Sequence, residues 1–201
     1  MATGMGLVPV RKNGAPYSSS GAKKMYIPST NSSTIGLYEA VKLVNAMDPN
    51  NEVPVVAQAA AGDALVGVIV GWDASAIGTS AIPLSGVPYR RASTNCYVLV
   101  ETDPSTVYQI QEDADSGVVA AVDIGSNFNA DLVFASYTAN TTTATGMSKT
   151  MLDSSTSSAS SCQVKMVGVM RDKVNAGAQS TGAVLEVRIL EHAYLVADSI
   201  T

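Results

Sequence analysis

The chain has 201 residues, of which 46% are hydrophobic and 14% charged, and its formal net charge is −5. This much aliphatic content with so little charge excludes a disordered chain, and two cysteines are too few for a disulfide scaffold. The acidic balance argues against a dedicated nucleic-acid binder. The longest strongly apolar stretch, residues 64–72, is far shorter than the roughly 20 residues of a membrane span. We therefore expect a soluble protein with neither a nucleic-acid nor a membrane partner.

Residues 1–34 differ in composition from the rest of the chain. They are rich in Gly, Pro, Ser and Asn and show no sustained hydrophobic period. Pro9, Pro16 and Pro28 cannot donate backbone hydrogen bonds, which excludes this stretch from the middle of a sheet. We expect an extended N-terminal arm over residues 1–34 and a β domain over residues 35–201.

From residue 37 onward the pattern is one of short strands divided by turns. Residues 57–61 could form one helical turn, and residues 138–161, which are dominated by Thr, Ser and Ala, predict a long loop with a short strand around 151–152. The predicted strands are 37–44, 53–56, 65–72, 97–101, 106–112, 117–122, 131–136, 164–170 and 184–190.

In three of these strands, the residue pattern also predicts which faces are buried. Residues 65–72 are apolar almost throughout, which is typical of a strand covered on both faces. Apolar and polar residues alternate in 106–112 and in 184–190, as half-buried strands require. Residues 102–105 (Thr-Asp-Pro-Ser) predict a tight hairpin connection between the strands on either side.

Together these signals predict an all-β fold, a jelly-roll-like sandwich or barrel of about eight to ten short strands. Cys96 and Cys162 lie far apart and in no CxxC arrangement. We expect two buried free thiols, although the sequence alone leaves a disulfide between them open.

The sequence offers no residues for catalysis. His192 is the only histidine, so a catalytic triad or a typical zinc site lacks its partners. The acidic run 112–117 does not match the ligand spacing of an EF-hand calcium loop. We expect no enzyme activity, no metal site and no cofactor.

Several segments, read in chain order, carry a resemblance. They are GDALVGVIVGW (62–72), YRRA (89–92), YVLVETDP (97–104), VYQIQED (107–113), GMSKTMLD (146–153), and the strands 163–170 and 184–194. This succession resembles the structural cement (head decoration) proteins of tailed bacteriophages. The resemblance covers residues 37–194.

The resemblance implies a jelly-roll-like β domain on the outer surface of a phage head with the HK97-type coat fold. Such a protein binds the major capsid protein and joins neighbouring capsomers non-covalently. The resemblance also implies self-association as a dimer at local two-fold positions, and a trimer at three-fold positions stays open as the alternative. Two alternatives stay open: another virion component such as a head fibre or tail protein, and a surface β-sandwich that binds a host carbohydrate or receptor.

The two parts of the chain differ in net charge, and this difference indicates which end could bind the capsid. Residues 1–34 have four basic and no acidic side chains (+4), whereas residues 35–201 have 8 basic and 17 acidic side chains (−9). A basic, unpatterned terminus on an acidic body is typical of an interaction tail. We expect it to order on the capsid through basic side chains and apolar anchors, namely Leu7, Val8, Val10, Arg11, Lys12, Tyr17, Lys23, Lys24 and Tyr26.

Overall fold

The computed structural model describes residues 4–50, 52–73, 89–112, 127–128, 146–153, 162–170 and 183–194, and these residues form an all-β structure. One 3₁₀ turn, η1 (Ser19–Gly21), interrupts the strands. The strands are β1 (Val8–Lys12), β2 (Ala15–Pro16), β3 (Lys23–Ile27), β4 (Ile35–Gly36), β5 (Ala40–Met47), β6 (Pro54–Gln58), β7 (Gly67–Trp72), β8 (Tyr89–Arg90), β9 (Cys96–Glu101), β10 (Val107–Gln111), β11 (Asn127–Phe128), β12 (Val164–Val169) and β13 (Val184–Ile189).

The all-β prediction is confirmed. Seven predicted strands are present as β5, β6, β7, β9, β10, β12 and β13, with ends shifted by up to three residues. The predicted strands 117–122 and 131–136 and much of the predicted loop 138–161 lie outside the described residues. The predicted helical turn at 57–61 is wrong, because β6 continues to Gln58 in register with β5.

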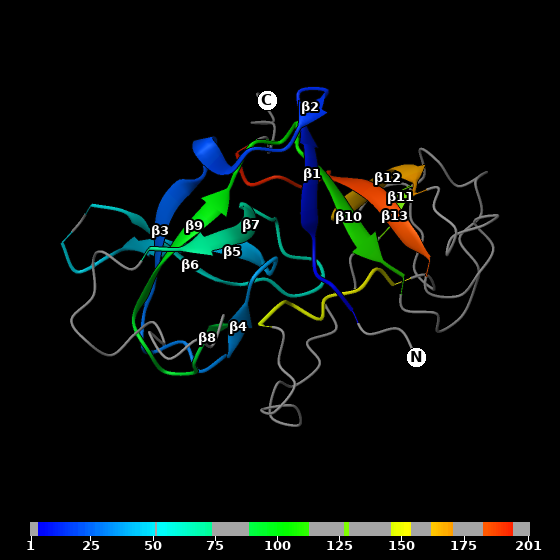
Figure 1. The fold of residues 1–201 in the computed structure, drawn as a ribbon. Helices are drawn as coiled ribbons and strands as arrows, with labels where there is room; N and C mark the ends of the chain where they lie inside the picture. Colours follow the sequence, from blue (N-terminus) through cyan, green and yellow to red (C-terminus); the bar gives the residue numbers. More distant parts are fainter. Residues whose placement is uncertain are drawn as a thin grey trace, which may run out of the picture.

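The strands form two layers (Figure 1). One is a closed barrel in the order β3-β6-β5-β7-β9, and the other is a six-stranded sheet in the order β11-β12-β13-β10-β1-β2. A short ladder, β4–β8, lies below the barrel in the view of Figure 1. The predicted hairpin at 102–105 is wrong: β9 belongs to the barrel and β10 to the sheet, so this turn carries the chain from one layer to the other.

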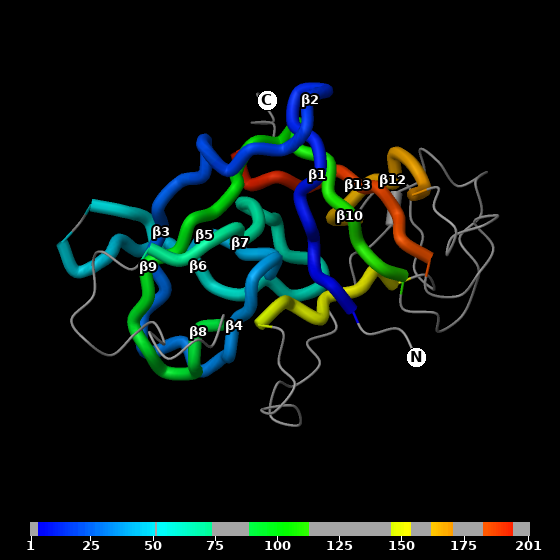
Figure 2. The backbone as a smooth tube through the Cα atoms, in the orientation of Figure 1, coloured from blue at the N-terminus to red at the C-terminus, as the bar shows by residue number. Residues whose placement is uncertain are grey.

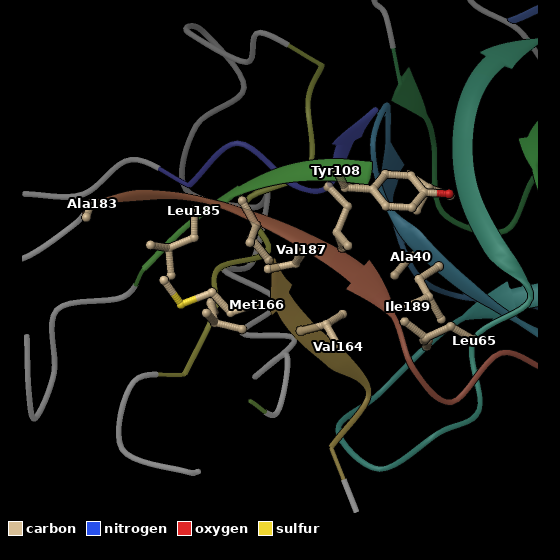
Figure 3. Close-up of a cluster of buried hydrophobic side chains, with 14 residues drawn as sticks. Ala40, Leu65, Tyr108, Val164, Met166, Ala183, Leu185, Val187 and Ile189 are labelled. Atoms are coloured by element: carbon tan, nitrogen blue, oxygen red, sulfur yellow. The ribbon is translucent and has the colours of Figure 1, made fainter. Parts of the chain in front are cut away.

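The main hydrophobic core lies between the layers. In Figure 3, Ile189 lies beside Ala40 and Leu65 of the barrel layer, and Val164, Val187, Met166 and Leu185 extend the same cluster along the sheet. The barrel contributes a smaller set that includes Ala40, Leu65 and Val68. The alternation predicted for β10 and β13 is confirmed, because their apolar positions are buried here and their charged or amide positions are not. Burying these aliphatic side chains is the main stabilising contribution to the contact between the layers.

A second core fills the barrel itself. It contains Met25 and Ile27 from β3 and Val98 and Val100 from β9, all with no exposed surface, together with Val41, Val56, Val66, Ile69, Ile35 and Cys96. Cys96 and Cys162 are both buried and form no disulfide, as the prediction of two buried thiols required.

A buried arginine closes one end of the barrel. Arg90 is 1% exposed, and burial lowers the pKa of its guanidinium to about 10. The guanidinium donates to four backbone carbonyls, at distances of 2.6 to 2.9 Å, those of Pro28, Asn31, Ser33 and Thr94. These bonds hold residues 28–33 against residues 90–94 beside the β4–β8 ladder.

The extended arm predicted for residues 1–34 is not confirmed. Residues 4–27, which we call the N-terminal segment, contribute β1 and β2 to the six-stranded sheet and β3 to the barrel. β1 pairs antiparallel with β10, and β3 pairs with both β9 and β6. The segment is therefore a structural part of both layers.

Local chemistry explains why the prolines did not prevent this. Pro9 lies opposite Tyr108 on β10, while β2 pairs with β1 only through Arg11 and Lys12. Pro9 therefore occupies an edge position, where a missing N–H costs no ladder bond. Asn13 and Gly14, with φ of 51° and 79°, form the β1–β2 turn, and Asn-Gly is a strong signal for such a hairpin.

The segment 146–153 joins parts of the chain that are far apart in sequence. It bridges to Leu37 through Met147 and to Glu112 through Leu152.

Glu39 is 1% exposed, and its Oε1 accepts from Thr150 Oγ1 and from Gln58 Nε2, each at 3.2 Å. Burial raises the pKa of Glu39 despite these donors.

Gly67 permits the close approach of β7 to β9, which leads to a prediction. A Cβ at this position would lie inside contact distance of the backbone carbonyl of Glu101. Gly67→Ala should therefore lower the free energy of unfolding by roughly 2–4 kcal/mol, measured by chemical denaturation.

Gly62→Ala is the control, because Gly62 also has a positive φ (82°) but no atom within 4 Å of an added Cβ. It should cost only about 1 kcal/mol. Equal losses for the two variants would show that the approach to Glu101 is not what requires glycine.

Candidate functional site

The apolar anchors expected in the N-terminal segment take part in the fold. Leu7 has no exposed surface and lies in the core between the layers. Tyr26 is 6% exposed on β3, and its ring lies 5.0 Å from that of Tyr97. Val8, Val10 and Tyr17 are partly buried. These residues are thus spread along both layers and do not form one exposed surface.

The four basic side chains of the N-terminal segment also have partners within the chain. Arg11 forms an ion pair with Glu186 on β13. Lys12 Nζ lies 3.0 Å from Glu101 Oε1, and Lys24 Nζ lies 3.0 Å from Asp73 Oδ2. The acidic body predicted from the charge distribution is the partner of these three side chains.

The remaining basic side chain makes an aromatic contact. Lys23 Nζ lies 5.0 Å from the ring centroid of Tyr194, within the range of a cation–π interaction. Lys24 combines its ion pair with a similar contact, 4.5 Å from the ring centroid of Tyr97. The basic residues therefore tie the N-terminal segment to other parts of the fold.

Exposed apolar side chains gather on one strand instead. Leu43, Val44 and Met47 on β5 are 37%, 38% and 48% exposed, and we call them the apolar strip. Asn45 and Ala46 between them are also exposed, so five consecutive residues carry no charge and face solvent. The predicted strand 37–44 includes only Leu43 and Val44 of these residues, and the outward direction of their side chains was not predicted.

The strip lies on a strand that is paired on one side only. β7 pairs with β5 through Ala40 and Val41, and beyond Val41 β6 is its only partner strand among the described residues. The register with β6 shifts between Leu43 and Met47. Such a bulge redirects side chains and leaves backbone groups outside the regular ladder. Figure 1 shows the β5–β6 hairpin projecting from the barrel.

Asp48 holds the tip of this hairpin. Its carboxylate accepts from the backbone N–H groups of Glu52 (2.6 Å) and Val53 (3.0 Å) and from the Tyr97 hydroxyl (2.7 Å). The Val53 N–H, with Tyr97 and Glu52, lowers the pKa of Asp48, although burial acts in the opposite direction. The hairpin is therefore fixed to β9 through Tyr97 and presents the apolar strip in one orientation.

The single histidine of the sequence is buried in the fold. His192 is 1% exposed, its Nδ1 accepts from the Tyr194 backbone N–H at 3.2 Å, and burial lowers its pKa. No group of three or more His, Cys, Asp or Glu in the described ranges is arranged to hold a metal ion. In the same ranges, no helix has the length and apolar character needed to cross a membrane.

Aromatic residues that could stack on a sugar are mostly within the fold. Trp72, at the end of β7, is partly buried against the barrel core. Tyr97 is 7% exposed, and Tyr194, at 47%, is the one clearly exposed aromatic residue in the described part of the chain. This distribution does not favour a carbohydrate-binding platform.

Comparisons with known proteins give no neighbour for this chain. It matches no family model, and no curated protein and no solved structure proved similar to it.

The bonds to Asp48 predict how the stability depends on pH. Asp48 titrates near 3.8 when unfolded and lower when folded, so between these values the unfolded chain binds more protons. The stabilisation is therefore complete above about pH 4 and is lost as the pH falls through the folded pKa. Asp48→Asn should be less stable than the wild type at about pH 7, and the difference should shrink toward about pH 2.

Denaturant titrations at each pH measure this difference. Tyr97→Phe is the matched variant, because it removes one donor and keeps the carboxylate with its two N–H donors. It should retain most of the acid-dependent part of the stability. A wild-type-minus-Asp48→Asn difference that is the same at every pH would contradict the role assigned to this carboxylate.

Proposed function

We propose that this protein is a structural, non-catalytic decoration protein of a tailed-bacteriophage head. It binds the major capsid protein on the outer surface of the head and joins neighbouring capsomers. The proposal includes a jelly-roll-like domain that self-associates as a dimer or trimer. Its starting point is the resemblance of residues 37–194 to cement proteins.

The single structural observation that supports this proposal is the apolar strip on β5. Exposed apolar groups in a contiguous row mark surfaces that contact other proteins. Leu43, Val44 and Met47 are exposed within five residues of one strand, and the bonds to Asp48 keep the hairpin in place before any partner binds. Because the surface is already ordered, little conformational entropy is lost on binding. We therefore place the coat-protein contact on the β5–β6 hairpin.

The internal structure of the protein also suits a cementing role. A protein that bridges capsomers resists their separation only if it does not itself come apart under load. The N-terminal segment pairs with strands of both layers, and it adds Arg11–Glu186 and Lys24–Asp73 ion pairs, one to each layer. Separating the layers would break the Lys12–Glu101 ion pair between β1 and β9 and expose the hydrophobic core between the layers.

A binding experiment on undecorated heads of the phage that encodes the chain tests the proposal. Leu43→Ser combined with Met47→Ser should reduce binding at least about tenfold, because two apolar contacts of about 1 kcal/mol each are lost. Leu190→Ser is the control, since Leu190 is similarly exposed (42%) but lies outside the hairpin. It should bind as the wild type does. Co-sedimentation gives the affinity, and cryo-electron microscopy gives the occupancy.

The possible outcomes test the decoration function and the β5–β6 contact surface independently. Wild-type protein that does not bind heads at all would refute the decoration function. Wild-type binding that the double substitution leaves unchanged would retain the function and refute the β5–β6 hairpin as the contact.

A further inference from the structure

Residues 190–194, which we call the clasp, carry the chain from the six-stranded sheet to the barrel layer. They follow β13, and in Figure 2 they run in red across the upper part of the view toward the barrel. The Leu65 N–H donates to the Glu191 carbonyl at 2.8 Å, and the Ala193 N–H donates to the Leu65 carbonyl at 2.7 Å. Ala193 also packs against the core of the barrel. The clasp is therefore a direct attachment between the two layers.

His192 lies in the middle of the clasp and is enclosed by the fold. It is 1% exposed, and it forms a parallel bridge with Leu65. Its Nδ1 accepts a hydrogen bond from the backbone N–H of Tyr194 at 3.2 Å. A ring nitrogen that accepts a hydrogen bond carries no proton, so the proton of the neutral ring is on Nε2. The bond from Tyr194 therefore exists only while His192 is neutral.

Tyr194 connects the end of the clasp to β3. The centroid of its ring lies 5.6 Å from that of His192 and 5.0 Å from Lys23 Nζ. The bond from its N–H to His192 helps to position this ring for the cation–π contact with Lys23. Protonation of His192 would remove that bond and would add a positive charge that Lys23 opposes.

Charged groups act on His192 from two neighbouring parts of the fold. Lys23 on β3 disfavours a positive ring, whereas Asp103, in the turn after β9, favours one, as does the backbone of Thr102. Burial has the largest effect, and the pKa of His192 is lowered as a result. In the described part of the chain, the residues outside the clasp that bond to its backbone are uncharged, namely Leu65 and Gln163.

We infer that the clasp is an acid-sensitive attachment between the layers, closed while His192 is neutral and released when the ring is protonated. Once the ring gains a proton, Nδ1 becomes a donor and its bond from the Tyr194 N–H is lost. The new charge is buried beside an N–H group that it repels, so moving the clasp into water relieves both costs. The inference does not depend on the proposed function, because it concerns only how the layers are joined.

The sign of the pH effect follows from the two pKa values of the ring. The pKa of His192 is near 6.5 in the unfolded chain and lower in the folded chain, so between these values the unfolded chain binds more protons. The stabilisation by neutral His192 is therefore complete above about pH 7 and is lost as the pH falls through the folded pKa.

Nuclear magnetic resonance on the full chain tests the inference directly. His192 is the only histidine, so labelling histidine with ¹⁵N reports on this ring alone. At about pH 8 we expect the tautomer with the proton on Nε2. On acidification the ring should titrate below 6.5, and the Tyr194 amide should lose its protection from hydrogen exchange in step with it.

Two results of this titration would overturn the inference. One is a neutral ring with its proton on Nδ1, or a ring that titrates at or above 6.5. The other is protection of the Tyr194 amide that does not change when the ring gains its proton.

His192→Asn is the matched variant, because the Asn side-chain oxygen can accept from the Tyr194 N–H but does not titrate. Denaturant titrations give the folding equilibrium constants of both proteins. Between about pH 7.5 and about pH 5, the constant of the wild type should fall at least about threefold relative to that of the variant. A ratio that stays constant over this range would also overturn the inference, and the labelled wild-type protein decides the question if the variant does not fold.

Discussion

The structure depends on the docking of a basic N-terminal segment onto an acidic body. Residues 1–34 carry a net charge of +4 and residues 35–201 a net charge of −9. The two oppositely charged parts interact with each other within the same molecule. Arg11, Lys12 and Lys24 each reach a carboxylate from a different strand or turn. Exposed ion pairs contribute little one by one, about 0–1 kcal/mol. Their effect here is to fix where the segment lies, while strand pairing and buried side chains such as Leu7 and Met25 supply most of the stabilisation.

The arrangement of the two layers follows from this docking. The N-terminal segment pairs with β10 before it pairs with β9 and β6, so the layers share one continuous piece of chain. The crossing at 101–107 runs beside it, and Lys12 bonds to Glu101 at the start of that crossing. With the layers held in this way, β5 is left at a surface where Leu43 and Met47 face solvent.

The sequence predicted well what depends on local hydrophobic pattern. The strands β7, β10 and β13 and their buried positions followed from continuous or alternating apolar residues. Pairing between distant segments has no such local signal. The charge distribution led us to expect carboxylate partners on the coat protein, whereas Arg11, Lys12 and Lys24 pair with carboxylates of the same chain, because charge alone does not distinguish another protein from the same chain. The pair Asn13-Gly14 is a local signal for a tight hairpin within the residues that were predicted to form an arm.

The exposure of the apolar strip also could not be predicted from the local sequence. A strand near residues 37–44 was predictable from its composition, yet the side that faces solvent depends on which neighbours pair with it. β7 stops pairing after Val41, and the bulge before Met47 changes the side-chain directions. Both are properties of the assembled barrel, so no pattern within β5 reveals them. The hydrogen-bond partners of Asp48 are likewise brought together from β9 and the β5–β6 turn only by folding.

Hydrogen exchange of the isolated protein, followed residue by residue with NMR, tests the central claim most directly. If the N-terminal segment is part of both layers, the bonded amides of β1 and β3 should be protected from exchange as those of β9 and β10 are, because each lies in a strand ladder. A free arm would exchange its amides at the rate of an unstructured peptide while β9 and β10 stay protected. That result would contradict the docking on which this account of the fold rests.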